Sequence, residues 1–129
     1  MNAVNIDQRT LTELDFCRLA QLRGANAPAE LAELLGEAEV VHAALLPRDV
    51  VTMYAQVDLE DVITGRRDRF VLCYPGQMEP REGCISVLSP IGLALIGLPV
   101  GGIASWQALS EPRCKARVVA VSRIAQFGT

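Results

Sequence analysis

The chain has 129 residues, half of them hydrophobic, and a formal net charge of -3. This size permits one compact domain or one domain with a small appendage. The sequence pI near 5.1 argues against a general nucleic-acid binder, which usually carries a basic excess. We therefore expect no direct sequence-specific contact with nucleic acid, and the low aromatic fraction of 5% predicts a mostly aliphatic core.

Four cysteines are spread along the chain: Cys17, Cys73, Cys84 and Cys114. Their spacing matches no zinc pattern, because the sequence has no CxxC pair and His42 is its only imidazole. Each cysteine lies in an apolar context, so we expect reduced thiols that pack as small core residues. The sequence predicts neither a metal site nor a cofactor.

Targeting signals are absent from the segments where they would be expected. Residues 1–8 lack the basic start and apolar run of a secretory signal. Residues 83–110 carry no charge, but Pro90, Pro99 and several glycines interrupt them, so no stretch of about 20 apolar residues remains. We expect a cytoplasmic protein without a membrane span.

The N-terminal part is predicted to be helical, beginning with a helix over residues 11–23. Thr10 or Asp7 is placed to cap its first turn. Asp15 and Arg18 stand three residues apart on the apolar side, a spacing that allows an ion pair. The leucines that share this helical face are Leu11, Leu14, Leu19 and Leu22.

A second helix is predicted over residues 29–40, after a break at residues 24–28. Its apolar residues recur with helical spacing at Leu31, Leu34, Leu35 and Ala38. The opposite face, which we interpret as solvated, carries Glu30, Glu33 and Glu37. Two short helices with a tight connection predict an antiparallel helical hairpin within residues 1–46.

The remainder of the chain, residues 47–129, has strand patterning. Apolar and polar residues alternate over 51–59, and Thr64-Gly65 marks a turn before the next strand. The strands that we predict cover 51–59, 69–74, 84–88, 103–109 and 115–122. The fold class is therefore α+β, with an antiparallel sheet wrapped around one short helix.

That short helix has residues typical of helix termini at both ends. Ser89 is a strong N-cap, and Pro90 suits the first helical position. Gly97 stands where a left-handed residue ends a helix, and Leu98 can supply the apolar contact of a Schellman ending. A helix this apolar is expected to pack into the sheet.

The motif SVLSPIGLALIGLPVG over residues 86–101 resembles the C-terminal domain of the Gre transcript cleavage factors. It is similar above all to their relative, the regulator of nucleoside diphosphate kinase family. The resemblance extends to PRDVVTM over 47–53, Thr64-Gly65, LCYP over 72–75 and DFCRL over 15–19. It implies an FKBP-like domain over 47–129 that docks on RNA polymerase near the secondary channel.

The resemblance also implies a contact site, at Leu88-Ser89-Pro90. Gre factors commonly have a carboxylate directly before Ser-Pro, whereas this chain has Leu88. If Leu88 is a docking residue, binding should depend less on salt, because apolar contacts are not screened. Leu88 is equally compatible with a core position at a strand end, and both alternatives stay open.

Catalytic chemistry finds little support in the sequence. No nucleophile is paired with His42, no phosphate-binding glycine loop is present, and Glu60-Asp61 stand next to a turn. The basic cluster Arg66, Arg67 and Arg69 is interpreted as a solvated hairpin end, with phosphate contact as the alternative. We therefore predict a protein that is not an enzyme.

The predicted function is a regulator that binds RNA polymerase and competes with Gre-type factors. Each predicted helix has ~14 residues or fewer and reaches about 21 Å. The tip, residues 23–28, has no carboxylate to hold a catalytic metal, so transcript cleavage should not be stimulated. The alternatives are an FKBP-like peptidyl-prolyl isomerase, with Phe70, Tyr74 and Trp106 as its sparse aromatics, and a direct modulator of nucleoside diphosphate kinase.

Overall fold

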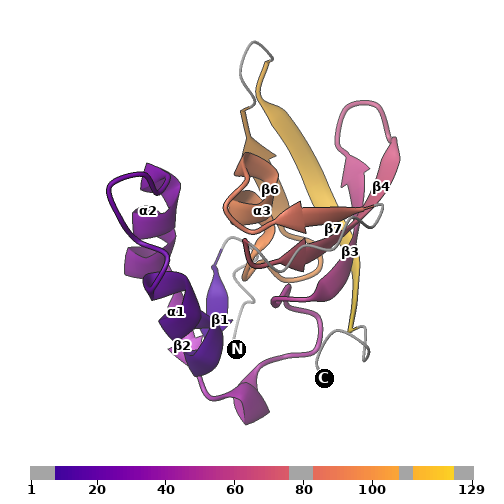
Figure 1. Ribbon diagram of the computed structural model, residues 1–129. Helices are drawn as coiled ribbons and strands as arrows, with labels where there is room; N and C mark the ends of the chain where they lie inside the picture. The colour runs from indigo at the N-terminus through magenta and orange to yellow at the C-terminus, as the bar shows by residue number, and fades with distance from the viewer. Residues whose placement is uncertain (1–7, 76–82, 108–111, 124–129) are drawn as a thin grey trace.

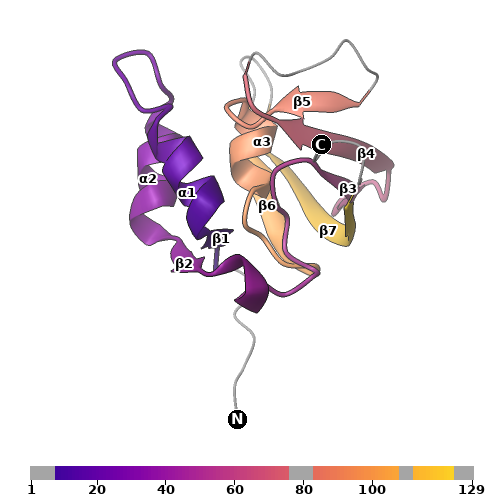
Figure 2. The ribbon, with the colours of Figure 1, turned by 60° about the horizontal axis from the view of Figure 1, so that its bottom comes forward.

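The computed structural model describes residues 8–75, 83–107 and 112–123. In its N-terminal part, two short helices lie side by side, and two short strands that pair with each other lie next to them (Figures 1 and 2). A single turn of 3₁₀ helix then leads to the sheet. These elements are β1 (Thr10–Thr12), α1 (Glu13–Ala20), α2 (Ala29–Glu37), β2 (Glu39–Val41) and η1 (Ala43–Leu45).

Helix α1 begins later than predicted, at Glu13 instead of residue 11. Thr12 caps it, because its hydroxyl accepts a hydrogen bond from the backbone N–H of Asp15 at 3.0 Å. Thr10 is therefore not the cap, and Asp7 lies outside the described residues. Leu11 belongs instead to β1, which pairs in parallel with β2 opposite Val40. Sequence periodicity does not reveal so short a parallel pair.

The buried face of α1 also differs from the prediction. Leu14 is 57% exposed, whereas Asp15 and Leu19 are buried. The carboxylate of Asp15 finds hydrogen-bond donors on the sheet side, so this polar residue is oriented inward. Helix α2 ends at Glu37 rather than near residue 40, and its predicted apolar face is confirmed because Leu31, Leu34 and Leu35 are buried.

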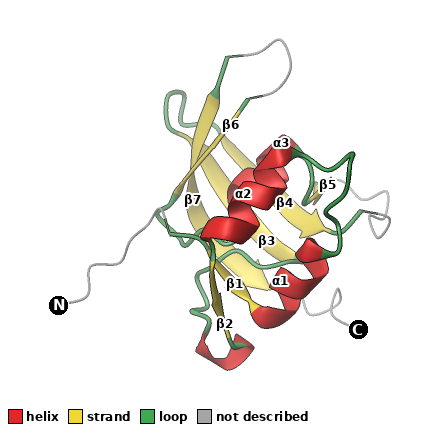
Figure 3. Ribbon diagram, turned by 90° about the vertical axis from the view of Figure 1, so that its left-hand side faces the viewer, coloured by secondary structure: helices red, strands yellow, loops and turns green. Residues whose placement is uncertain are grey.

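The larger part is a five-stranded sheet with the order β5-β4-β3-β7-β6 (Figure 3). Its pairs are antiparallel except for β4 with β5, which is parallel. The elements are β3 (Ala55–Asp61), β4 (Arg67–Cys73), β5 (Cys84–Ser86), α3 (Pro90–Leu95), β6 (Ile103–Trp106) and β7 (Cys114–Arg123). The α+β class is confirmed, while the FKBP-like likeness and the hairpin geometry stay predictions.

The first strand of the sheet starts at Ala55, not at residue 51. Tyr54 adopts a positive φ of 65°, which turns the chain and ends any continuous strand. The segment before it is buried on both sides, since Val51, Thr52 and Met53 are all shielded from solvent. Over residues 51–54, the alternation of apolar and polar residues therefore belongs to a buried turn and not to a strand.

Other strand boundaries also differ, and β4 begins at Arg67 instead of residue 69. The strand predicted over 84–88 ends at Ser86, because Val87, Leu88 and Ser89 form a turn into α3. The strand predicted over 103–109 is described as far as Trp106, and residues 108 and 109 lie outside the described residues.

One hydrophobic core joins both parts of the molecule. Leu19 and Leu31 from the helices belong to the same buried cluster as Val57, Leu72 and Leu95. Cys73 is buried as expected, but Cys17 is exposed on α1, so the prediction of a core role is wrong for that thiol. Within the described ranges, no helix has the length and apolar character needed to cross a membrane.

Candidate docking surface

The turn that precedes α3 is held by its own serine side chains. Ser89 Oγ accepts from the N–H of Gly92 at 3.1 Å and donates to the carbonyl oxygen of Ser86 at 2.7 Å. Ser86 Oγ in turn accepts from the N–H of Leu88 at 3.1 Å. The predicted cap is confirmed. Because these bonds occupy Ser89 Oγ as both donor and acceptor, this hydroxyl shapes the turn.

Leu88 and Pro90 lie on the outside of this turn. Leu88 is half-buried and packs against the edge of the core, while Pro90 is exposed. The fully buried place at the end of the strand belongs to Val87. The turn thus presents an apolar ridge to solvent, and Leu88 combines a core contact with an accessible surface.

Gly92 allows α3 to lie directly on the end of β5. A Cβ at this position would overlap the carbonyl oxygen of Ser86 and lie 2.9 Å from the Cα of Val87. Backbone atoms cannot move aside as a flexible side chain can, so glycine is required here for steric reasons. No pattern in the sequence distinguishes this glycine from the others.

The far end of α3 is capped from the N-terminal part. Gly97 has the predicted positive φ, 86°, but the Schellman bonds are absent among the described residues: the N–H of Gly97 donates to the carbonyl oxygen of Val51, and that of Leu98 to the carbonyl oxygen of Leu95. Arg9 Nη1 donates to the carbonyl oxygens of Leu93 and Ile96, at 2.9 Å each. Burial lowers the pKa of the Arg9 guanidinium, and the nearby Glu37 carboxylate raises it. Arg9 therefore connects the helices of the N-terminal part to α3.

A second polar link joins the N-terminal part to the larger part that contains the sheet. Asp15 accepts from the hydroxyl of Tyr74 at 3.2 Å and from the backbone N–H of Met53 at 3.4 Å. The guanidinium of Arg18 lies 5.9 Å from the centre of the Tyr74 ring, and the Tyr54 ring packs edge-on against it. Burial, followed by the Asp15 carboxylate, raises the pKa of Tyr74. Asp15 is thus a link between the two parts.

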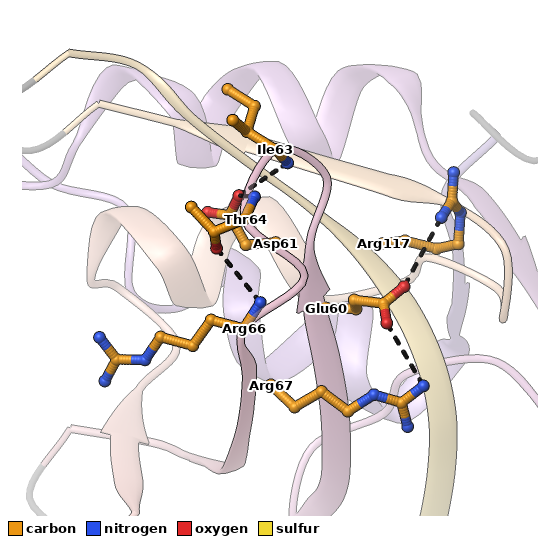
Figure 4. Close-up of polar contacts among 7 residues, drawn as sticks. All are labelled: Glu60, Asp61, Ile63, Thr64, Arg66, Arg67 and Arg117. Atoms are coloured by element: carbon orange, nitrogen blue, oxygen red, sulfur yellow. Dashed lines mark hydrogen bonds and ion pairs between the residues drawn. The ribbon is translucent and has the colours of Figure 1, made fainter.

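The basic cluster lies at the β3–β4 hairpin and is neutralised locally. Arg67 pairs with Glu60 at 3.3 Å, and Arg69 pairs with Asp58 at 2.8 Å. Glu60 also lies 3.9 Å from Arg117 of the neighbouring strand (Figure 4). Pairs as exposed as these contribute little to stability. Their balance of charge supports the solvated hairpin end and leaves the phosphate alternative without an observation in its favour.

The tip of this hairpin is an ordered turn. Asp61 Oδ1 accepts from the N–H groups of Ile63 and Thr64, at 2.8 and 2.9 Å, and Thr64 Oγ1 accepts from Arg66 (Figure 4). These backbone hydrogen bonds lower the pKa of Asp61, and the bond from Thr64 has the larger effect. Ile63 stands at the tip with 86% of its surface exposed.

Between the two parts lies a groove of about 850 Å³, formed by α2, α3 and β6. Leu93 and Trp106 contribute apolar surface to it, and the glutamates of α2 form one wall. Pro90, the first residue of α3, also lines the groove. The groove and the turn before α3 are therefore neighbouring features of one surface.

Catalytic groups do not gather on this surface. Within the described part of the chain, no group of three His, Cys, Asp or Glu side chains is placed to hold a metal ion. His42 is exposed, and its Nδ1 accepts from the N–H of Ala44 at the start of η1.

A family model described as "Transcription elongation factor, GreA/GreB, C-term" matches residues 46–123. The chain belongs to this family. The matched range contains the turn before α3, Gly92 and the whole five-stranded sheet. The resemblance identified from the motif over 86–101 is thereby confirmed.

Individual relatives agree with this GreA/GreB assignment. A transcription elongation factor GreA of Solidesulfovibrio magneticus is 45% identical over 62 residues, 48% of this chain and 38% of that protein. A regulator of nucleoside diphosphate kinase from Escherichia coli is 34% identical over 73 residues, 57% of this chain and 54% of that protein. The match thus spans about half or less of these curated relatives.

A solved structure extends the likeness to nearly the whole chain. The prokaryotic transcription elongation factor GreA/GreB from Nitrosomonas europaea superposes with a TM-score of 0.73 at 29% identity. The superposition covers 89% of this chain and 98% of that one. The N-terminal helices are therefore part of the similarity in fold, in addition to the sheet.

Proposed function

We propose that this protein is a regulator that binds RNA polymerase near the secondary channel. The observation that carries the proposal is the GreA/GreB match over residues 46–123, which includes the rigid turn at Leu88-Ser89-Pro90. In this proposal residues 47–129 form the docking domain, and residues 1–46 form the appendage that Arg9 and Asp15 hold in place.

The three residues of the turn have different roles in this proposal. Ser89 is a positioning residue, because both hydrogen bonds of its hydroxyl lie within the turn. Leu88 and Pro90 make the contact, because each has accessible apolar surface. Binding through apolar area depends weakly on salt, since screening acts on charges.

The regulator is proposed to occupy the polymerase without stimulating transcript cleavage. Helices α1 and α2 have 8 and 9 residues, which at 1.5 Å per residue are about 12 and 13 Å long. The connection between them, residues 21–28, contains no aspartate or glutamate that could hold a catalytic metal. Occupancy of the same site would exclude Gre-type cleavage factors, and the protein itself is not an enzyme.

Competition for RNA polymerase tests the proposal. A labelled Gre-type cleavage factor is bound to polymerase and displaced by this protein at 50 and 300 mM salt. Wild type should displace it at both concentrations, and Leu88→Asp should require about tenfold more protein, since a charge would enter an apolar contact. Ile63→Asp, which puts the same charge at a more exposed apolar position on the β3–β4 tip, is the control.

Two outcomes contradict the docking assignment. If Leu88→Asp loses cooperative melting, Leu88 belongs to the core and the contact lies elsewhere. If Leu88→Asp folds and displaces the cleavage factor as wild type does, the turn is not the contact. Failure of the wild-type protein to displace the factor rejects polymerase competition itself.

Direct modulation of nucleoside diphosphate kinase is the second candidate. The E. coli relative that is 34% identical over 73 residues is named a regulator of that enzyme. A pull-down from cytosol with the kinase as the captured protein, repeated with purified kinase alone, separates direct binding from an indirect effect.

Peptidyl-prolyl isomerase activity receives no support from the aromatics. Tyr74 is buried against Asp15 and Tyr54, and Trp106 lies on β6, with β3 and β7 between it and Phe70 on β4. These side chains do not converge on a proline pocket.

A further inference from the structure

The groove between α2, α3 and β6 has a size and composition that the turn at Leu88-Ser89-Pro90 does not explain. Its volume of about 850 Å³ falls within the range of ligand-binding clefts, about 300–1,000 Å³. It combines two kinds of surface that lie on different elements, an apolar floor and an acidic wall. A ligand that matches both must carry apolar groups and cations together.

The apolar floor comes from α3 and β6. Leu93 and Ala94 line it from the helix, and Leu98, Ile103 and Trp106 line it from the segment that follows. Trp106 packs against the core with one part and is only half-buried. The chain contains a single tryptophan, and it thus places a large part-exposed aromatic ring in this groove, a residue type that recurs at the centres of protein interfaces.

The acidic wall is a row of carboxylates on α2. Glu30, Glu33 and Glu37 are exposed, follow one another at helical spacing and all line the groove. From the first to the last, the row is about 10 Å long at 1.5 Å per residue. A row of this length matches several cations on one polymer better than it matches a single small ion.

The charges that face this row are placed unevenly. Arg9 lies at the Glu37 end and is already bonded to the carbonyls of α3; burial lowers the pKa of its guanidinium, and the Glu37 carboxylate opposes that shift. Arg113 donates to Ser105 Oγ at 3.0 Å on the side of β6. Among the described residues, Glu30 and Glu33 form no ion pair or side-chain hydrogen bond, so both carboxylates are available to a ligand.

We propose that this groove binds a cationic amphipathic segment of a partner protein. Its lysine or arginine side chains pair with Glu30 and Glu33, and its apolar side chains pack on Leu93 and Trp106. A helical segment suits the site, because two of the three walls are helices and such grooves bind helices through one apolar face. The inference goes beyond the proposed polymerase contact and does not depend on it.

Fluorescence of Trp106 measures occupancy directly. The probe is a 14-residue helical peptide of leucine and lysine with one apolar face. The controls are the same peptide with glutamate in place of lysine, a scrambled peptide of equal composition, and spermine. The lysine peptide should shift the emission saturably to shorter wavelength, while the three controls should not.

Removal of two charges from the acidic wall of α2 tests whether these carboxylates bind the ligand. Glu30→Gln with Glu33→Gln should weaken binding of the lysine peptide about fivefold, as expected for the loss of two exposed ion pairs, and should reduce its salt dependence. The matched control is Glu13→Gln with Glu39→Gln, which removes the same charge from exposed positions outside the groove. Cooperative melting of all variants ensures that only folded proteins are compared.

The outcomes that overturn the proposal are separate from those of the polymerase experiment, because this assay contains only protein and peptide. Equal binding of the glutamate peptide would show that the charge of the ligand does not matter. Equal binding of the scrambled peptide would show that a helical apolar face is not needed. Unchanged affinity in the Glu30/Glu33 variant shows that the wall is not used. A shift caused by spermine alone points to a small polycation, and sedimentation of the free protein as a dimer that the lysine peptide does not dissociate points to a second copy.

Discussion

At the scale of single residues, close approaches and buried polar groups determine how the candidate surface is built. Gly92 brings α3 onto the backbone of β5, and Asp15 joins α1 to the sheet. Neither role depends on hydrophobic patterning, which is the property that the sequence displays most clearly. Both roles can be tested by substitutions that add or remove a single methyl or hydroxyl group.

Gly92→Ala should destabilise the protein by about 1–3 kcal/mol, since the added methyl group meets backbone atoms of Ser86 and Val87. Thermal melting measures the effect. Gly36→Ala is the matched control: no atom lies within 4 Å of its Cβ position, and alanine should stabilise α2 by about 0.5–1 kcal/mol. Equal melting temperatures for the two variants would contradict the close approach.

Tyr74→Phe tests the buried link to Asp15. The raised pKa of Tyr74 means that the folded state retains the proton when the unfolded state has lost it above about pH 10. Stability is therefore complete below pH 10 and falls as pH rises further, by up to about 1.4 kcal/mol per pH unit for each proton. Urea unfolding between pH 7 and 11 should show a shallower fall for Tyr74→Phe.

The same variant should be about 1–2 kcal/mol less stable than wild type at pH 7, because the Asp15 carboxylate loses a buried donor. If the pH profiles of the two proteins coincide, Tyr74 ionisation is not linked to folding.

At the scale of elements, α3 is too short to be stable by itself and depends on its two ends. Its six residues are capped at the start by Ser89 and at the end by Arg9. Isolated helices of this length do not persist in water. The helix therefore exists because a local serine and a distant arginine satisfy its terminal groups.

Ser89→Ala should cost on the order of 1 kcal/mol, because the N–H of Gly92 loses its acceptor. Chemical denaturation gives the change. Ser122→Ala, at an exposed serine of β7, is the control and should stay near wild type. A value for Ser89→Ala as small as that of the control would mean that water replaces the cap.

Arg9→Met should cost more, about 2–3 kcal/mol, because two carbonyl oxygens of α3 lose a charged donor. Amide hydrogen exchange should accelerate in α3 before it does in the central strands β3 and β7. Arg66→Met at the exposed hairpin is the control, with little change expected. Exchange that accelerates uniformly across the sheet would argue against a specific clamp.

At the scale of the whole molecule, the two parts act as one body because they share a core and two polar links. Truncation before residue 47 would remove Leu11, Leu19 and Leu31 from that core and remove Arg9 from α3. The orientation of the N-terminal helices toward the proposed docking turn is thus determined by buried contacts.

The final prediction concerns transcript cleavage. Added alone to a backtracked elongation complex, the protein should leave the RNA uncleaved, because residues 21–28 carry no carboxylate and the helices are about 12 and 13 Å long. Gel analysis of labelled RNA measures this, with a Gre-type factor as the positive control. Metal-dependent shortening of the RNA by this protein would contradict it.

Local chemistry determined much of this structure in advance. Ser89 as a cap, the left-handed Gly97 and the apolar face of α2 follow from short-range rules that need only neighbouring residues. The family likeness followed from the same motif, since the spacing of serine, proline and glycine reflects backbone requirements. The turn at Leu88-Ser89-Pro90 was found in this way.

Tertiary structure alone decided the features that join distant segments. Arg9 reaches α3 across 84 residues, Asp15 reaches Tyr74 across 59, and Gly92 meets the end of β5. The groove beside Trp106 likewise exists only where α2, α3 and β6 meet. The physical reason is that a buried polar group must find a partner wherever the fold supplies one, and sequence spacing does not encode that distance in space.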